Sequence, residues 1–324
     1  MVDPKNHSFT SNSKIIKVFG SLILFIAPVL IIMTAVEIYI RTIPTTTKLK
    51  KDYISANSDS LQVLILGSSQ MERAINPEFL DAKAINLSNS AQTLDENYIL
   101  LKHFEKSLPA LKVVVIEVLF NTLQIKDNYS PLVIHHLNWI DYKANTFGRR
   151  IKFQDNLLYY THPQYFTNLI INHINESSPQ NFNIYGFDTN KFDGSFNVAN
   201  FDINKVEEKD IYIENSLNND SFEKNSKLLI DFLSLCESKK LDVVIYGTPS
   251  HEKYNSLRNK EMINMRNSLF EDVKLKFPKT KFLLNEENKD YDYKLFFNAN
   301  HLNSKGAEKA SKELNKFLTS EFNF

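Results

Sequence analysis

A hydroxyl near the start of the folded part of the chain and an imidazole near its end are residue types that nucleophilic catalysis requires. Ser69 follows the apolar run Leu61–Leu66 and Gly67, and His301 stands just before a helix expected over Lys305–Thr319. If both lie at the carboxyl edge of an open α/β sheet, where such folds bind ligands, the imidazole can take the hydroxyl proton. The simpler alternatives are a common Gly-Ser-Ser turn whose serine caps a helix, and a surface histidine near a helix start.

Two further segments carry groups that can stabilise a developing oxyanion. Small and polar residues fill positions 86–93, Asn-Leu-Ser-Asn-Ser-Ala-Gln-Thr, so that backbone N–H groups there can approach a substrate oxygen. Asn121 follows the apolar run Val113–Val118 and can donate its side-chain N–H. The alternatives are a turn that caps the helix expected from Asp95, and an ordinary turn asparagine.

Together these segments resemble the motifs of the SGNH (GDSL-like) hydrolase superfamily, and most of all its membrane-anchored members that act on cell-envelope polymers. The resemblance implies that Ser69 is the nucleophile, His301 the base and Asn298 the residue that orients His301. It also implies an oxyanion hole formed by the backbone N–H groups of Ser69 and Ala91 and by the side chain of Asn121. The implied activity is that of a serine esterase or O-acyltransferase on acyl groups of envelope glycans or polymers, with a membrane acyltransferase as a candidate partner.

Four positions depart from the family pattern. Ser68 replaces an aspartate, Arg73 stands where a small residue is usual, and Ala91 replaces a glycine, which leaves its N–H usable if φ is negative there. Asn298 replaces the triad aspartate, so an oxygen can still accept from the imidazole but no charge stabilises the imidazolium. A comparable Asp→Asn change in a serine protease costs about 10⁴ in rate. The alternative function is therefore a catalytically weak or inactive binding or assembly protein of the cell envelope.

Further polar residues at the same sheet edge are candidate contacts for a substrate. They are Ser68, Asn86, Ser90 and His251. His251 follows the expected strand Asp242–Tyr246 and is also a second candidate for the base.

The adjacent His135 and His136 point apart on either a helix or a strand, which makes them a poor metal pair. Because the sequence carries no recognisable metal or phosphate-binding motif, we expect neither a metal nor another cofactor.

Short β-rich apolar runs alternate with amphipathic stretches along the chain. The expected strands are Leu61–Leu66, Val113–Val118, Asp242–Tyr246 and Lys281–Leu284. The expected helices are Asp95–Lys106, Phe222–Glu237, Glu252–Lys276 and Lys305–Thr319. This alternation predicts an α/β protein, a flavodoxin-like three-layer αβα sandwich around a parallel sheet. Residues from about 128 to 220 break the rhythm and are expected to form a large insertion within the domain 61–324.

The N-terminal part of the chain has the pattern of a membrane anchor. Residues 18–36 contain no charge, and 19 helical residues span roughly 30 Å, the thickness of a bilayer's hydrocarbon core. A cleaved signal peptide is the alternative, but the run is long for one and no cleavage site follows closely. We therefore expect a cytoplasmic tail over 1–17, a transmembrane anchor over 18–36 and a connector over 37–60. The protein would be a single-pass membrane protein with its C-terminal domain extracytoplasmic.

Charge and cysteine content exclude several classes of protein. Lys+Arg and Asp+Glu both number 38, so the chain lacks the basic excess that a nucleic-acid binder needs. Cys236 is the single cysteine, which excludes an intrachain disulfide framework and a cysteine-rich zinc site. With 43% apolar and 23% charged residues, the composition is that of a globular protein.

Overall fold

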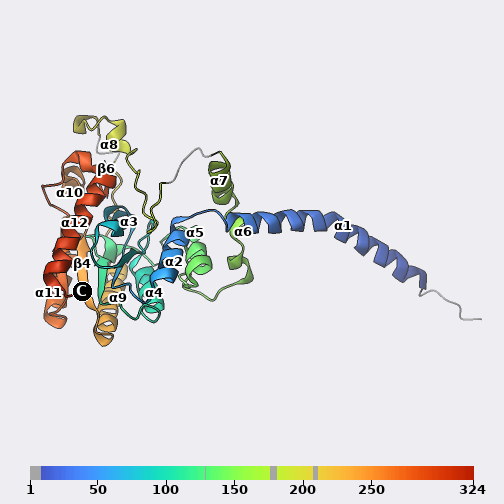
Figure 1. Ribbon diagram of the computed structural model, residues 1–324, viewed down its shortest axis with the longest axis horizontal. Coiled ribbons are helices and arrows are strands. Elements are labelled where there is room, and N and C mark those ends of the chain that lie inside the picture. The colour runs from blue at the N-terminus through green and yellow to red at the C-terminus, as the bar shows by residue number, and fades with distance from the viewer. Residues whose placement is uncertain (1–8, 128, 176–180, 207–210) are drawn as a thin grey trace, which may run out of the picture. The chain divides into compact units, whose positions relative to one another are not determined.

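The computed structural model describes residues 9–127, 129–175, 181–206 and 211–324 (Figure 1). The chain divides into two compact units. The first unit joins Met1–Pro44 to Phe153–Ser178, and the second consists of Thr45–Lys152 and Pro179–Phe324. The candidate catalytic residues all belong to the second unit.

A five-stranded parallel sheet forms the centre of the second unit. Its strands are β1 (Val63–Leu66), β2 (Ala84–Asn86), β3 (Val113–Glu117), β4 (Asp242–Gly247) and β5 (Lys281–Leu284). Their order is β2-β1-β3-β4-β5, with every neighbouring pair parallel. This is the doubly wound order of flavodoxin-like folds, in which ligands bind where the strand order reverses, here between β1 and β3. The predicted α/β class and parallel sheet are thus confirmed.

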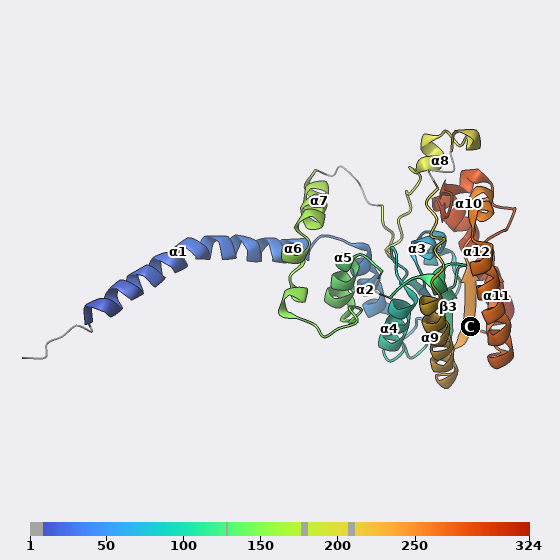
Figure 2. The same cartoon turned by 180° about the vertical axis from the view of Figure 1, so that it is seen from behind.

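Strands β1, β2 and β3 are buried at every position and β4 at all but its first, as the continuous apolar strands predicted, whereas the edge strand β5 is partly exposed. The covering helices include α3 (Ser69–Ala74), α4 (Leu94–Phe104), α9 (Asn219–Ser238) and α12 (Ser304–Glu321). Val63 and Ile65 of β1 pack into one core with α3 and α12, while Leu64 and Leu66 pack into another with α4 and α9 (Figure 2). Because successive side chains of a strand point to opposite faces, a strand covered on both sides must be apolar throughout.

The helix expected over Glu252–Lys276 is divided into α10 (Glu252–Leu257) and α11 (Lys260–Lys276). Asn259 caps α11, because its side-chain oxygen accepts hydrogen bonds from two backbone N–H groups of the new helix's first turn. The interruption also leaves Arg258 free to turn toward the loop that follows β5, where it pairs with Glu286 at 3.9 Å.

Short helices fill the segment between β3 and β4, where the sequence predicted an insertion. They are η2 (Thr122–Gln124), α5 (Leu132–Leu137), η3 (Asn138–Tyr142), η4 (Phe153–Asn156), α6 (Leu158–Thr161), α7 (Pro163–Ile174), α8 (Ser195–Val198) and η5 (Ile203–Lys205). The remaining elements of the second unit are α2 (Thr46–Asn57), η1 (Pro77–Phe79), η7 (Tyr293–Leu295) and an antiparallel pair, β6 (Phe296–Asn298) and β7 (His301–Leu302). Residues 128, 176–180 and 207–210 of the predicted insertion lie outside the described residues.

The first unit contains the long apolar helix α1 (Phe9–Ile40), with Pro28 inside it. Its segment Ile15–Ile40 has the length and composition to cross a membrane. By itself such a helix is compatible with a single-pass anchor or with a signal sequence. Of the expected tail 1–17, residues 1–8 lie outside the described residues, and the helix has already begun at Phe9.

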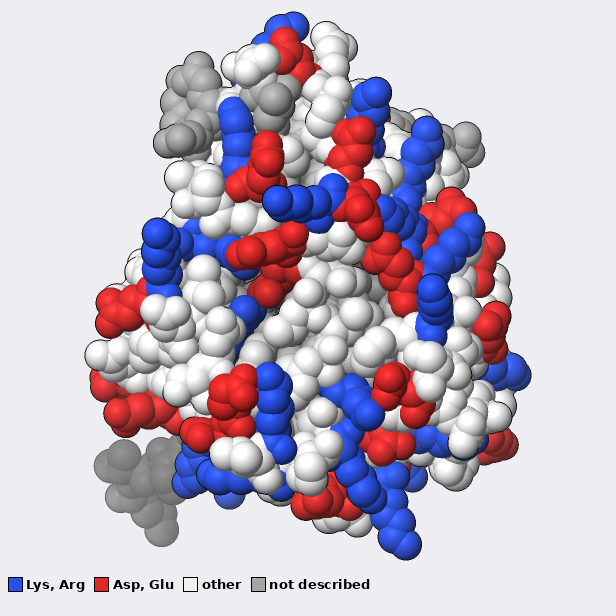
Figure 3. Space-filling model, turned by 90° about the vertical axis from the view of Figure 1, so that its left-hand side faces the viewer, with Lys and Arg blue, Asp and Glu red and all other residues white. Residues whose placement is uncertain are grey.

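Charges of both signs alternate over the surface of the second unit that Figure 3 shows. Lysine and arginine side chains there stand among aspartate and glutamate side chains, and no broad region of that face carries one sign alone. This agrees with the formal net charge of zero.

Candidate active site

Three side chains from two distant parts of the chain meet beyond the carboxyl end of β1. The Oγ atom of Ser69, the first residue of α3, lies 2.8 Å from Nε2 of His301, although 232 positions separate the two residues. The Nδ1 atom of His301 lies 3.0 Å from Oδ1 of Asn298, the last residue of β6. Hydroxyl, imidazole and amide therefore form one continuous hydrogen-bonded series.

The surroundings of Asn298 fix which nitrogen of His301 carries the proton. The same Oδ1 atom accepts the backbone N–H groups of Asn300, at 3.2 Å, and of His301, at 2.9 Å. Backbone N–H groups can only donate, so the atom facing them is the amide oxygen rather than the amide nitrogen. Nδ1 of His301 must then donate to that oxygen, which leaves Nε2 unprotonated and facing the Ser69 hydroxyl. This is the tautomer that a general base needs.

The electrostatic surroundings keep the His301 imidazole neutral. Burial, and after it the positive charge of Arg73, lower the pKa of His301 to about 3. The Arg73 guanidinium lies over the Phe297 ring, 4.1 Å from the ring centroid. An imidazole of such low pKa is available to accept a proton at neutral pH, but the imidazolium formed in the reaction receives little stabilisation.

Gly67 is required before the nucleophile because the backbone there passes very close to its neighbours. A Cβ atom at this position would lie 2.6 Å from Cβ of Met71 and 2.8 Å from Cβ of Glu117. Any larger residue would push α3 away from β3. The glycine thus sets the sharp turn that places Ser69 at the first position of α3.

Glu117, at the end of β3, stabilises this turn by a hydrogen bond. Its Oε2 atom accepts the backbone N–H of Ser68 at 2.7 Å, and the Thr248 hydroxyl lies 3.3 Å from its Oε1 atom. Burial raises the pKa of the Glu117 carboxyl to about 7. The sequence analysis did not select Glu117, although a carboxylate inside an otherwise apolar buried strand was a signal, because such a group needs partners.

We expect Glu117→Ala to lower kcat for a chromogenic acetyl ester by about 10²-fold, since a small displacement of the nucleophile has effects of this size. KM should change little, because Glu117 touches the turn and not the substrate. Glu117→Gln should restore most of the rate, since its side-chain oxygen can still accept the Ser68 N–H. Equal losses in the two variants would show that the charge of Glu117, and not its hydrogen bond, matters.

Ala91 adopts a left-handed backbone conformation, with φ of 53°. The condition under which alanine was expected to present its N–H, a negative φ, is therefore not met. The backbone instead takes the conformation typical of glycine, at a cost of about 1–2 kcal/mol for a residue with a Cβ. The Ala91 carbonyl accepts the Ser130 hydroxyl at 2.9 Å, which helps to hold this conformation.

Ala91→Gly should consequently raise the free energy of unfolding by up to about 1 kcal/mol, because relief of the strain exceeds the entropy that glycine adds to the unfolded chain. Thermal unfolding followed by circular dichroism measures this change. Ala310→Gly, within helix α12, is the control and should be destabilising. A lower melting temperature for Ala91→Gly would contradict the strain assignment.

The structure gives two other candidates local structural contacts. The Asn86 side chain donates to the carbonyl groups of Met71, at 3.0 Å, and Ile75, at 2.8 Å, and so ties β2 to α3. Asn121 donates to the Glu214 carbonyl at 3.4 Å, and no hydrogen bond joins it to the catalytic residues in the described part of the chain.

Ser68, Ser90 and His251 also lie near the ends of strands or in adjoining turns. Ser68 is the N-cap of α3, where its hydroxyl accepts the Gln70 N–H at 3.3 Å, and Ser90 is exposed. His251 caps α10 and is buried against Phe196 and Phe296. Burial lowers the pKa of His251. Its contacts are those of a residue that shapes a loop, and substrate binding by these side chains remains a prediction.

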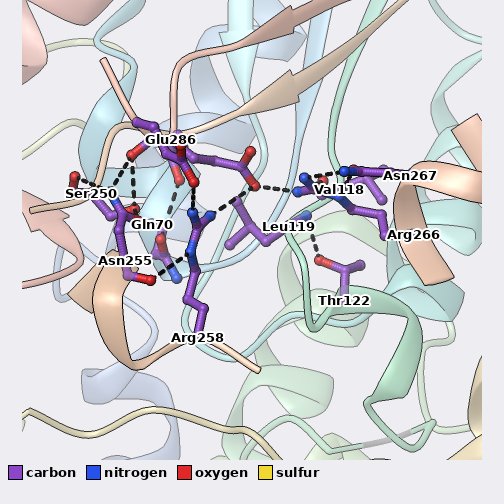
Figure 4. A network of polar contacts seen from close by, with 12 residues as sticks. Gln70, Val118, Leu119, Thr122, Ser250, Asn255, Arg258, Arg266, Asn267 and Glu286 are labelled. Atoms are coloured by element: carbon purple, nitrogen blue, oxygen red, sulfur yellow. Dashed lines mark hydrogen bonds and ion pairs between the residues drawn. The ribbon is translucent and has the colours of Figure 1, made fainter. Parts of the chain in front are cut away.

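A buried ion network stabilises the loops beyond β4 and β5 (Figure 4). Glu286 pairs with Arg266 and lies 3.9 Å from Arg258, while its backbone carbonyl accepts the Asn255 amide at 2.7 Å. Gln70, the residue after the nucleophile, lies in the same view, and its Oε1 accepts the Thr248 hydroxyl at 3.2 Å. The two loops are thereby fixed to the start of α3.

Comparison with known proteins adds little to this geometry. No family model matches the chain, and no curated protein matches it. A candidate platelet activating factor of Streptococcus pneumoniae is similar in structure over 84% of this chain and 91% of its own, with 11% identity and a TM-score of 0.40. A candidate acylhydrolase of Bacteroides fragilis is similar over 83% and 96%, with 9% identity and a TM-score of 0.39. Likenesses this distant carry no argument about the reaction.

Across residues 9–127, 129–175, 181–206 and 211–324, no group of three or more histidine, cysteine, aspartate or glutamate side chains is arranged to hold a metal ion.

Proposed function

We propose that the protein is a membrane-tethered, extracytoplasmic serine esterase or O-acyltransferase of SGNH type, acting on acyl groups of cell-envelope glycans or polymers. One observation carries the proposal, the series of contacts from Ser69 through His301 to Asn298. The resemblance of the sequence motifs supports the family. The apolar helix α1 supports tethering, and a membrane acyltransferase is the partner that would supply acyl groups at that surface.

The reaction follows from the direction of these hydrogen bonds. Ser69 Oγ forms a bond to the acyl carbonyl carbon while its proton moves to Nε2 of His301. The leaving alcohol then takes that proton as the ester bond breaks, and the acyl group stays on Ser69. In the second half, the oxygen of water or of an acceptor hydroxyl attacks the acyl carbon while its proton moves to His301. His301 then returns this proton to Ser69 Oγ as the bond between Ser69 and the acyl group breaks.

An oxyanion forms in both halves of this reaction, and three groups are proposed to stabilise it. They are the backbone N–H groups of Ser69 and Ala91 and the side chain of Asn121, with Ala91 offering its N–H from the glycine-like conformation rather than from the negative φ expected of alanine. Asn121 would exchange its long contact with the Glu214 carbonyl, 3.4 Å, for the substrate oxygen. Preorganised donors of this kind contribute about 3 kcal/mol each to the transition state.

A fluorophosphonate probe tests the nucleophile directly. It should label the full-length protein in detergent at a single serine, which peptide mass spectrometry should identify as Ser69. Ser69→Ala should abolish labelling, and Ser68→Ala should retain it. Labelling of another serine, or none in folded protein, would contradict the proposed chemistry.

The second candidate function is a binding or assembly protein with the same fold. Asn298 in the triad position and the lowered pKa of His301 favour it, because both weaken stabilisation of the imidazolium. If the probe does not label the native protein although thermal unfolding shows that this protein is folded, the result would support the binding function over the enzyme.

A further inference from the structure

A charge-free stretch within the insertion belongs to the same compact unit as the apolar helix α1. Residues 156–175, here called the α6–α7 segment, contain no lysine, arginine, aspartate or glutamate over 20 positions. They include Tyr159, Tyr160 and Tyr165. A surface segment of that length without a charge is unusual in a chain of which 23% is charged.

The end of α1 is built into the fold of this segment (Figures 1 and 2). The Glu37 carboxylate accepts the backbone N–H groups of Leu158, at 2.9 Å, Tyr159, at 2.7 Å, and Tyr160, at 3.2 Å. These are the donors that a helix leaves unsatisfied at its start, and here α1 satisfies those of α6. If α1 were removed, the three N–H groups would lose this acceptor, which favours a retained anchor over a cleaved signal.

Two further contacts join the same parts of the chain. The Arg41 guanidinium donates to the Asn156 carbonyl at 2.5 Å, and the Tyr39 ring packs on His173 with centroids 6.3 Å apart. Glu37, Tyr39 and Arg41, which lie in the last turn of α1 or just after it, therefore contact both the start of α6 and the end of α7. The α6–α7 segment is fixed beside the point where α1 ends.

Several large side chains of the α6–α7 segment are exposed to solvent. Tyr160 is 61% exposed, and Ile171 and Ile174 of α7 are 48% and 65% exposed. Fully burying side chains of this size gains about 1.5–3 kcal/mol each. Tyrosine is enriched at the boundary between lipid and water, where its ring is apolar and its hydroxyl remains hydrated.

The length of α1 determines how deep in the bilayer the residues of the α6–α7 segment lie. Ile15–Ile40 contains 26 residues, whereas about 20 helical residues cross the hydrocarbon core of a bilayer. The last turn of α1, including Glu37, can therefore reach the headgroup region. We propose that the α6–α7 segment lies in this lipid interface, with Ile171 and Ile174 toward the acyl chains and the tyrosines among the headgroups. The proposal rests on the membrane anchor of the proposed function, and it is independent of the esterase activity.

Tryptophan fluorescence in vesicles tests this placement with the full chain. Trp139 is the single tryptophan, so Trp139→Phe gives a dark background. Into it we would introduce Ile171→Trp and, as a matched control on α11 of the other unit, Leu275→Trp, where the native side chain is 82% exposed. The variants are reconstituted in phosphatidylcholine–phosphatidylglycerol vesicles with and without brominated acyl chains.

The proposal predicts blue-shifted emission and quenching by brominated lipid for Ile171→Trp, and neither effect for Leu275→Trp. Ile174→Trp repeats the test if the first variant does not fold. Absence of quenching in protein that floats with the vesicles would overturn the interfacial placement and leave the anchor intact. Failure of the folded protein to float with the vesicles would overturn both the anchor and the placement.

Discussion

Replacing Ser69 with alanine is expected to lower turnover of p-nitrophenyl acetate by at least about 10³-fold. The Ser69 hydroxyl is the group that faces the unprotonated nitrogen of His301, at 2.8 Å, and it alone can form the acyl intermediate in this series. Removing it eliminates the covalent route and leaves binding and oxyanion stabilisation. Initial rates measured over a range of ester concentrations should therefore show the loss in kcat.

Ser68→Ala is the matched control, because it changes the same atoms one position earlier. The Ser68 hydroxyl caps α3 through the Gln70 N–H, while the bond to Glu117 comes from the Ser68 backbone and is kept. This variant should lose about 1 kcal/mol of stability and retain its kcat, whereas loss of the predicted Ser68 contact to the substrate would appear as a higher KM. If Ser69→Ala retained the native rate, Ser69 would not be the nucleophile and the esterase proposal would be wrong.

The sheet was predictable because its strands are continuous apolar runs. Val113–Glu117 is buried at every position, and only a strand covered on both faces requires this of five consecutive residues. The division between α10 and α11 was less visible, since Arg258 and Asn259 are compatible with a helix. The break depends on a buried ion network whose other members lie on distant parts of the chain, which local patterns do not report.

The approach of Ser69 to His301 followed only in part from a topological rule. Residues that come just after parallel strands lie at one edge of the sheet, which places Ser69 after β1. His301 instead lies in β7 of the antiparallel pair, and the motif resemblance, not the strand pattern, indicated its partner. The parts that the sequence did not reveal are long-range contacts of single side chains. Glu117 contacts Ser68 across 49 positions, and Glu37 contacts Leu158 across 121. In neither case does the local sequence indicate which residue is the partner.

The left-handed conformation of Ala91 differs from the sequence-based expectation for another reason. Alanine rarely adopts positive φ, so a sequence rule favours the opposite conformation. The surrounding turn overrides that preference, with the carbonyl of Ala91 tied to Ser130. Strain of this size persists where the surrounding structure determines the backbone, and it concentrates at functional sites.

Asn298→Asp is expected to raise kcat for the same ester by about 10²-fold or more, because a carboxylate stabilises the imidazolium that forms as Ser69 loses its proton. The change keeps the contacts at this position, since the carboxylate can accept Nδ1–H and the two backbone N–H groups that Asn298 Oδ1 now accepts. It adds the charge that the native site lacks.

The pH dependence separates this effect from a simple repair of geometry. The base must be neutral to accept a proton, and the pKa of His301 is lowered to about 3, so native kcat/KM should stay level from pH 8 down to about pH 4 and fall below that. A carboxylate next to the imidazole raises the pKa of His301, so the acid limb of Asn298→Asp should move to higher pH.

Asn298→Ala completes the comparison, because it removes both the acceptor and the fixed tautomer and should lower kcat below the native value. A gain in Asn298→Asp with a loss in Asn298→Ala would identify the native site as an enzyme that works without imidazolium stabilisation. Loss of activity in Asn298→Asp would contradict this account, and it would mean that the neutral pair of Asn298 and His301 is itself the required state. Probe labelling of Ser69 in each variant would then show whether that state serves nucleophilic attack or binding alone.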